Sequence, residues 1–212
     1  MPLTVKICGL KTSQALDAAL ESGADLVGFV FFPPSPRNIG WEVARTLGAR
    51  VKGRAGKVAL TVNATDDRLR AIIEALEPDM LQLHGNETPE RVGVVRGKFK
   101  LPVIKALPIA DRILFDARAP ETATRPGGLG KPFDWTLLRG IKVGVPFMLS
   151  GGLDANNVAD AVRITGAPGV DVSSGVERAP GVKDPAKIRA FIGAARAADV
   201  LDLDASDAVT DA

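Results

Sequence analysis

The stretch LTVKICGLKTSQALDAALESGADLVGFVF, residues 3 to 31, predicts a strand, a helix and a second strand. Leu3–Ile7 and Asp25–Phe31 are short, mainly apolar runs, which is typical of strands covered on both faces. Between them, Thr12 is suited to cap a helix, and Gly23 is a residue type that ends one. This order indicates two parallel strands joined by a crossover helix.

The same alternation continues along the chain. Further helices are predicted after Thr65, which precedes two acidic residues, and after Asp184, where a cap is followed by a proline. Strands alternating with helices predict a single-domain α/β fold, the parallel (β/α)8 or TIM barrel. The eight expected strands are Leu3–Ile7, Asp25–Phe31, Lys57–Asn63, Asp79–Leu83, Pro102–Ala106, Arg112–Asp116, Pro146–Ser150 and Gly169–Ser173.

The connection between the fifth and sixth expected strands is unusually short. Only Leu107–Asp111 separates them, whereas parallel strands normally need a crossover of about a dozen residues or more. Five extended residues span about 16–18 Å, roughly the height of a short strand, so a return without a helix is possible. We therefore expect a barrel that lacks its fifth helix. The flanking helices would then expose apolar sides, which could attract a partner or weaken the fold.

Composition limits the range of partners. The 212 residues are 46% hydrophobic, enough for one core, and 27 basic against 25 acidic side chains leave a net charge of only +2. We expect a small-molecule substrate, no nucleic-acid or membrane partner, and a monomer or weak homodimer. The single cysteine and the absence of a signal-like or long apolar segment predict a soluble cytoplasmic protein.

The end of the chain differs from the rest. Residues 199–212 carry five aspartates and no basic residue, with few large apolar side chains to anchor them. We therefore expect a catalytic barrel domain over residues 1–198 and a disordered acidic tail over residues 199–212.

In such a barrel, chemistry is expected at the carboxyl ends of the strands. Cys8 closes the first strand, Asp116 closes the sixth, and Arg37 lies in a proline-rich loop after the second. An arginine held on a stiff backbone is suited to bind a carboxylate. Each residue has a plainer alternative, since a free cysteine is often buried, an aspartate can cap a turn and an arginine can be solvated.

Two glycine-bearing loops indicate a phosphate site. Ser150-Gly151-Gly152 follows the seventh strand and Ser173-Ser174-Gly175 follows the eighth, where such barrels commonly bind phosphate through backbone N–H groups. A third glycine-rich loop, Gly127–Lys131, follows the sixth strand, and we expect it to be mobile and able to cover a ligand.

Six short motifs occur in the order KICG (6–9), GFVF (28–31), LQLHG (81–85), FDW (133–135), LSGGL (149–153) and DVSSGVE (171–177). Together, over residues 3–198, they resemble the phosphoribosylanthranilate isomerase family. The resemblance implies a (β/α)8 barrel that needs no cofactor and no metal ion. It implies conversion of N-(5-phosphoribosyl)anthranilate to 1-(2-carboxyphenylamino)-1-deoxyribulose 5-phosphate by an Amadori rearrangement in tryptophan biosynthesis.

The resemblance also implies roles for individual residues. Cys8 stands at the position of the general base, Asp116 at that of the general acid, and Arg37 where the anthranilate carboxylate binds. His84 is expected to contact substrate, and Trp135 to serve packing. The residues implied at the phosphate site are Gly151, Gly152, Ser173, Ser174 and Gly175.

Activation of Cys8 needs a source of positive charge. A base must be deprotonated, and a free thiol has a pKa of about 8.5, so a nearby cation or a favourable dipole should help. Strand alternation is expected to send the Lys6 side chain to the opposite face, which would exclude it as the activator.

Two other interpretations remain at this point. A histidine-pathway isomerase performs the same rearrangement, but that family has an aspartate where Cys8 stands. Alternatively, the shortened chain is a catalytically impaired barrel that only binds a phosphorylated ligand.

Overall fold

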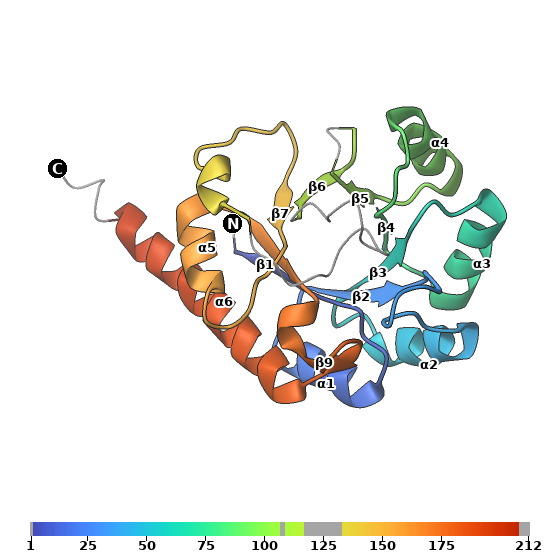
Figure 1. Ribbon diagram of the computed structural model, residues 1–212, viewed down its shortest axis with the longest axis horizontal. Helices are drawn as coiled ribbons and strands as arrows, with labels where there is room; N and C mark the ends of the chain where they lie inside the picture. The colour runs from blue at the N-terminus through green and yellow to red at the C-terminus, as the bar shows by residue number, and fades with distance from the viewer. Residues whose placement is uncertain (1, 107–108, 117–132, 208–212) are drawn as a thin grey trace.

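The computed structural model describes residues 2–106, 109–116 and 133–207, and its centre is a closed barrel of eight parallel strands (Figure 1). Neighbouring strands pair in chain order, and β1 pairs with β8 to close the barrel. The predicted (β/α)8 fold is confirmed. The strands are β1 (Thr4–Cys8), β2 (Leu26–Val30), β3 (Gly56–Thr61), β4 (Met80–Leu83), β5 (Val103–Lys105), β6 (Arg112–Phe115), β7 (Phe147–Leu149) and β8 (Gly169–Val172).

Helices surround the barrel (Figure 1). Thr12, Thr65 and Thr88 each cap a helix with a side-chain oxygen that accepts a backbone N–H, as expected for the first two from the sequence. None of the helices that the described residues form is long and apolar enough to cross a membrane. The helices are α1 (Ser13–Glu21), α2 (Trp41–Val51), α3 (Asp66–Leu76), α4 (Pro89–Phe99), α5 (Val158–Thr165) and α6 (Pro185–Asp207).

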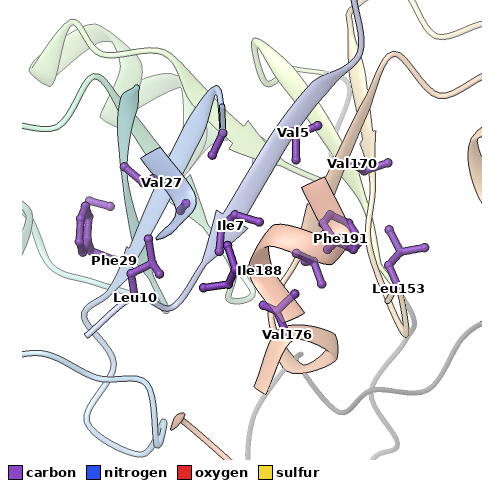
Figure 2. Close-up of a cluster of buried hydrophobic side chains, with 14 of the residues drawn as sticks. Val5, Ile7, Leu10, Val27, Phe29, Leu153, Val170, Val176, Ile188 and Phe191 are labelled. Atoms are coloured by element: carbon purple, nitrogen blue, oxygen red, sulfur yellow. The ribbon is translucent and has the colours of Figure 1, made fainter. Parts of the chain in front are cut away.

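Alternation along β1 separates two cores. Val5 and Ile7 are fully buried on the outer side of the barrel, in the cluster that includes Ile188 and Phe191 of α6 (Figure 2). Cys8 belongs to a different, smaller cluster, together with Val30 and Leu60. Since successive side chains of a strand point to opposite faces, even-numbered residues of β1 point into the barrel.

The lower part of the barrel interior is filled by apolar side chains from several strands. They form a compact cluster that is separate from the outer core. This inner cluster fills the barrel below the level of Cys8, so the barrel is a packed interior and not a pore. The cluster comprises Leu26, Val58, Ile104, Leu114 and Met148, with Met80 packed against it.

The connection from β5 to β6 contains no helix in its described residues, 106 and 109–111, as the sequence predicts. Asp111 anchors it: Val103 donates its N–H to Asp111 Oδ2 at 2.8 Å, and the Asp111 N–H donates to the Val103 carbonyl at 2.9 Å. Arg96 of α4 forms an ion pair with Asp111 Oδ1. The short link is therefore held to both β5 and α4.

The apolar exposure expected beside this link is confined to a few described side chains. Val94 of α4 and Ile109 of the link are exposed, whereas Val92 and Val95 of α4 are buried. Trp135, further along the chain, packs against the main hydrophobic core, in agreement with its predicted packing role. It begins the short 3-10 helix η1 (Trp135–Leu138), the only helical segment among the described residues between β6 and β7.

The last helix runs further than the sequence predicts. Helix α6 continues to Asp207, nine residues beyond the expected end of the barrel domain at Ala198, which is itself buried. The disorder expected of residues 199–212 stays a prediction. Extending an existing helix costs far less than starting one, and alanines and leucines favour it. Residues 208–212 lie outside the described part, and the domain boundary at residue 198 stays a prediction.

Candidate active site

Cys8 lies at the inner mouth of the barrel, where β1 ends. Its side chain is buried against Val30 and Leu60, and Gly28 of the adjacent strand lies directly beside it. A Cβ placed on Gly28 would be only 2.9 Å from the Cys8 Sγ, so the glycine provides the space that the thiol occupies. The local sequence therefore builds a thiol-sized site between β1 and β2.

Lys6 lies on the same inner face as Cys8, and the prediction that it points away is wrong. The two residues are two positions apart, so the strand's period of two puts both side chains on one face. Lys6 is completely buried, and its Nζ lies 2.9 Å from Asp171 Oδ1 of β8, its register partner. The charged pair thus spans the seam between β1 and β8.

The surroundings of the Cys8 thiol act on its pKa in opposite directions. Burial raises the pKa most, and Asp171 raises it further, whereas Lys6 and Lys183 lower it. The net pKa lies above the ordinary value. Burial lowers the pKa of Lys6, but Asp171 and Cys8 more than offset this, so the lysine remains charged.

Asp116 follows β6 directly, and His84 follows β4. Their side chains are largely buried, and His84 Nε2 is 3.7 Å from Asp116 Oδ2, longer than a direct hydrogen bond. Burial lowers the pKa of His84, and Lys6 and Lys105 add to this, while Asp171 and Glu87 act the other way. The imidazole beside Asp116 is therefore neutral at neutral pH.

Arg37 is buried and held by a carboxylate that sequence reasoning did not single out. Its Nε and Nη2 donate to the two oxygens of Glu177 at 2.8 and 2.9 Å, a bidentate pair that fixes the guanidinium plane. Gly9 leaves room for the arginine, since a Cβ there would lie 2.7 Å from Arg37 Cδ. Burial raises the pKa of Glu177, but Arg37 and Lys183 lower it to below its usual value.

Lys183 connects this arginine to the loop after β8. It lies on β10 (Val182–Lys183), which pairs with β9 (Glu177–Ala179). Its Nζ donates to Glu177 Oε1 at 2.9 Å and to the Ser173 carbonyl at 2.8 Å. Ser173 in turn donates its hydroxyl to the Cys8 carbonyl at 3.3 Å. A chain of polar contacts therefore links Arg37, the loop after β8 and Cys8.

The two predicted phosphate loops lie against each other. Gly151 and Gly152 after β7 have φ of +89° and +69°, in the left-handed region that favours glycine. Gly175 lies in the 3-10 helix η2 (Ser174–Val176) after β8, and a Cβ on it would be 1.9 Å from the Leu153 carbonyl oxygen. The glycine at this position is what allows the loops to touch.

The residues that sequence reasoning missed are mainly buried charges. Glu177 and Asp171 are visible in the sequence only as part of the motif 171–177, because their partners Arg37 and Lys6 lie far away in the chain. Lys183 carries no distinguishing local signal. Lys6 has a usable signal, its spacing of two from Cys8. The glycine-rich loop Gly127–Lys131 lies outside the described residues, and within those described no three His, Cys, Asp or Glu side chains are grouped to hold a metal ion.

A closed parallel barrel with ionisable side chains and glycine loops at the carboxyl ends of its strands defines a (β/α)8-barrel enzyme. Residues 5–194 match the family model described as N-(5'phosphoribosyl)anthranilate (PRA) isomerase. The chain is 60% identical over 214 residues to N-(5'-phosphoribosyl)anthranilate isomerase of Nitrobacter winogradskyi, covering 94% of this chain and 95% of that one. With the Rhodopseudomonas palustris enzyme the identity is 58%, with coverage of 95% and 99%.

Solved structures give the same result. The phosphoribosyl anthranilate isomerase of Thermotoga maritima superposes with a TM-score of 0.80 at 33% identity, covering 92% of this chain and 99% of that one. A structure of such an isomerase in complex with reduced 1-(o-carboxyphenylamino)-1-deoxyribulose 5-phosphate gives 0.76 at 31% identity, with the same coverage. The chain belongs to the N-(5'-phosphoribosyl)anthranilate isomerase family. Its reaction is an aldose–ketose isomerisation in tryptophan biosynthesis.

Proposed function

We propose that Cys8 and Asp116 carry out the Amadori rearrangement of N-(5-phosphoribosyl)anthranilate as general base and general acid. Asp116 donates its proton to the furanose ring oxygen, and the bond from that oxygen to C1′ breaks to give a Schiff base. Cys8 then removes the proton from C2′. The resulting enolamine becomes the ketone, 1-(2-carboxyphenylamino)-1-deoxyribulose 5-phosphate.

The observation that supports these roles is their placement. Cys8 ends β1 and Asp116 follows β6, two strands on different sides of one barrel mouth, so that a bound sugar can be met from two directions. His84, which is neutral at neutral pH, lies beside Asp116, with its Nε2 3.7 Å from Asp116 Oδ2.

The other predicted site residues are proposed to bind the two anionic groups of the substrate, the anthranilate carboxylate and the phosphate. Arg37, whose guanidinium plane is fixed by Glu177, is proposed to bind the anthranilate carboxylate. The contact between the two glycine loops supports a single, shared phosphate site. The residues proposed to bind the phosphate are Gly151, Gly152, Ser173, Ser174 and Gly175, with His84 as a further substrate contact.

The decisive test of the roles is kinetic. Cys8→Ser and Asp116→Asn should each lower kcat by at least about 100-fold, the usual scale for loss of a general acid or base, while binding of a product analogue is retained. Gly97→Ala, a change in α4 where nothing lies within 4 Å of the added carbon, serves as the control and should keep wild-type turnover. Near-normal turnover by either active-site variant removes that residue from the scheme.

The assembly and location are proposed as a monomer or weak homodimer in the cytoplasm. Support comes from the exposed large apolar side chains of the described residues, which lie on five different segments rather than in one continuous patch. The single cysteine is consistent with a reducing compartment. Light scattering during gel filtration measures the assembly, and a stable dimer at low micromolar concentration would contradict it. The exposed side chains are Val43, Val94, Ile109, Leu137 and Val182.

A further inference from the structure

A buried charged pair lies directly below the active-site thiol. The side chains of Lys6 and Asp171 are 1% and 5% exposed, and they connect β1 to β8 inside the barrel. Two charges buried in this way seldom stabilise a fold more than well-packed apolar side chains of similar size would. Stability is therefore a weak explanation for a lysine at this position.

We propose that Lys6 is a positioning residue that favours the thiolate over the thiol form of Cys8, and that Asp171 fixes the Lys6 ammonium on the inner face of the barrel below the thiol. This inference rests on the proposed role of Cys8 as the general base. The step is a proton equilibrium: the thiol loses its proton to solvent, and the positive charge of the lysine stabilises the thiolate that remains. Lys6 itself does not touch the reacting atoms.

The geometry provides few other charges that could do this. Lys6 from β1, Asp171 from β8 and Lys183 from β10 are the charged groups that act on the thiol. The neighbours of Cys8 on β2 and β3, Val30 and Leu60, are apolar. Lys183 is already engaged by Glu177 and Ser173, whereas Lys6 lies on the same inner face of β1 as Cys8, two positions before it. Lys6 is therefore the principal positive charge available to a buried thiolate.

The chain is well suited to a direct titration. It has one cysteine and no tyrosine, so the rise of thiolate ultraviolet absorbance with pH reports Cys8 without tyrosinate interference. Lys6→Met alone would leave Asp171 buried without its partner. The double variant Lys6→Met/Asp171→Asn avoids this, and both are measured on the full chain, with Cys8→Ala as the baseline.

The matched control is a second buried pair in the same barrel. Lys105 of β5 and Glu87 are 2.8 Å apart and similarly buried, and neither is among the groups that act on the Cys8 thiol. Lys105→Met/Glu87→Gln should lose comparable stability but keep the wild-type thiol midpoint. Lys6→Met should raise that midpoint by at least about one pH unit, since loss of a nearby opposite charge typically shifts a pKa by about one to three units. In the double variant the rise should be smaller, because the Asp171 charge that opposes the thiolate is lost as well.

The pH profile of kcat/KM gives the second measurement. Its acidic limb should move upward in the Lys6 variants by the same amount as the thiol midpoint of each variant. An unchanged thiol midpoint in Lys6→Met, or an equal shift in the Lys105 control, overturns the inference. Normal turnover by Cys8→Ala would instead overturn the proposed role of Cys8 as the general base. The absorbance titration reports the effect of Lys6 on the thiol whether or not Cys8 is the base, so failure of one claim can be told from failure of the other.

Discussion

Replacing Gly28 with alanine tests whether the space beside Cys8 is part of the active site. The added methyl carbon would lie 2.9 Å from Cys8 Sγ and 3.1 Å from Cys8 Cα, whereas ordinary van der Waals contact starts at 3.4 Å. One of these atoms is backbone, so rotation of the thiol alone cannot relieve the overlap. The thiol and strand β1 must therefore move by about half an ångström.

The expected effect has two parts. Overpacking a filled interior costs about 1 to 3 kcal/mol of unfolding free energy, which urea denaturation measures. A displaced base costs more in rate, since an error of about 1 Å can reduce turnover about 100-fold, so we expect kcat/KM to fall by about 10-fold to 100-fold. Loss of phosphoribosylanthranilate fluorescence measures the rate.

The matched control is Gly97→Ala in α4. Nothing lies within 4 Å of the Cβ that it would add, and an alanine within a helix is more stabilising than a glycine by about 0.5–1 kcal/mol. It should keep full activity and gain stability. A Gly28→Ala protein that is as active and as stable as the wild type would show that close packing of β2 against Cys8 is not what positions the thiol.

Other variants test separate parts of the structure. Glu177→Gln should raise KM about 10-fold to 100-fold with a smaller change in kcat, because Arg37 loses a charged bidentate partner; an unchanged KM would contradict this. The pKa of Glu177 is lower in the folded protein than in the unfolded chain, where it is about 4.3. The Glu177 carboxylate therefore stabilises the fold above the unfolded-state pKa, and this contribution is lost as the pH falls through the folded-state pKa. As the pH is lowered from about 6 to 3, the urea midpoint of unfolding should therefore fall less steeply for Glu177→Gln than for the wild type. Asp111→Ala should lower the free energy of unfolding by about 1 to 3 kcal/mol, because the hydrogen bond from the Val103 N–H is lost. Asp160→Ala, which removes an exposed ion pair, should change that free energy by no more than about 0.5 kcal/mol, as measured by urea denaturation.

The barrel itself could be predicted from local patterns. Apolar runs, threonine caps and the short spacing from Ala106 to Arg112 depend only on neighbouring residues, and they indicate the eight strands and the missing fifth helix. The end of α6 could not be predicted in the same way, because an acidic composition typical of disorder can also continue a helix that has already formed.

Local sequence patterns predict only part of the candidate active site. Cys8, Asp116 and Arg37 could be placed at one rim because the fold puts every strand end there. Their partners could not, since Glu177 is 140 residues from Arg37 in the chain, and Asp171 is 165 from Lys6. The error over Lys6 was avoidable, because two positions apart on a strand means the same face.

The central claim is that a barrel without its fifth helix isomerises phosphoribosylanthranilate. The most direct measurement is steady-state turnover of that substrate by the purified wild-type chain, with the product identified as 1-(2-carboxyphenylamino)-1-deoxyribulose 5-phosphate. We predict turnover that is lost in Cys8→Ala and in Asp116→Ala. Binding of a product analogue without any turnover by the wild type would contradict the claim and show a barrel that has kept its ligand site but lost its catalytic geometry.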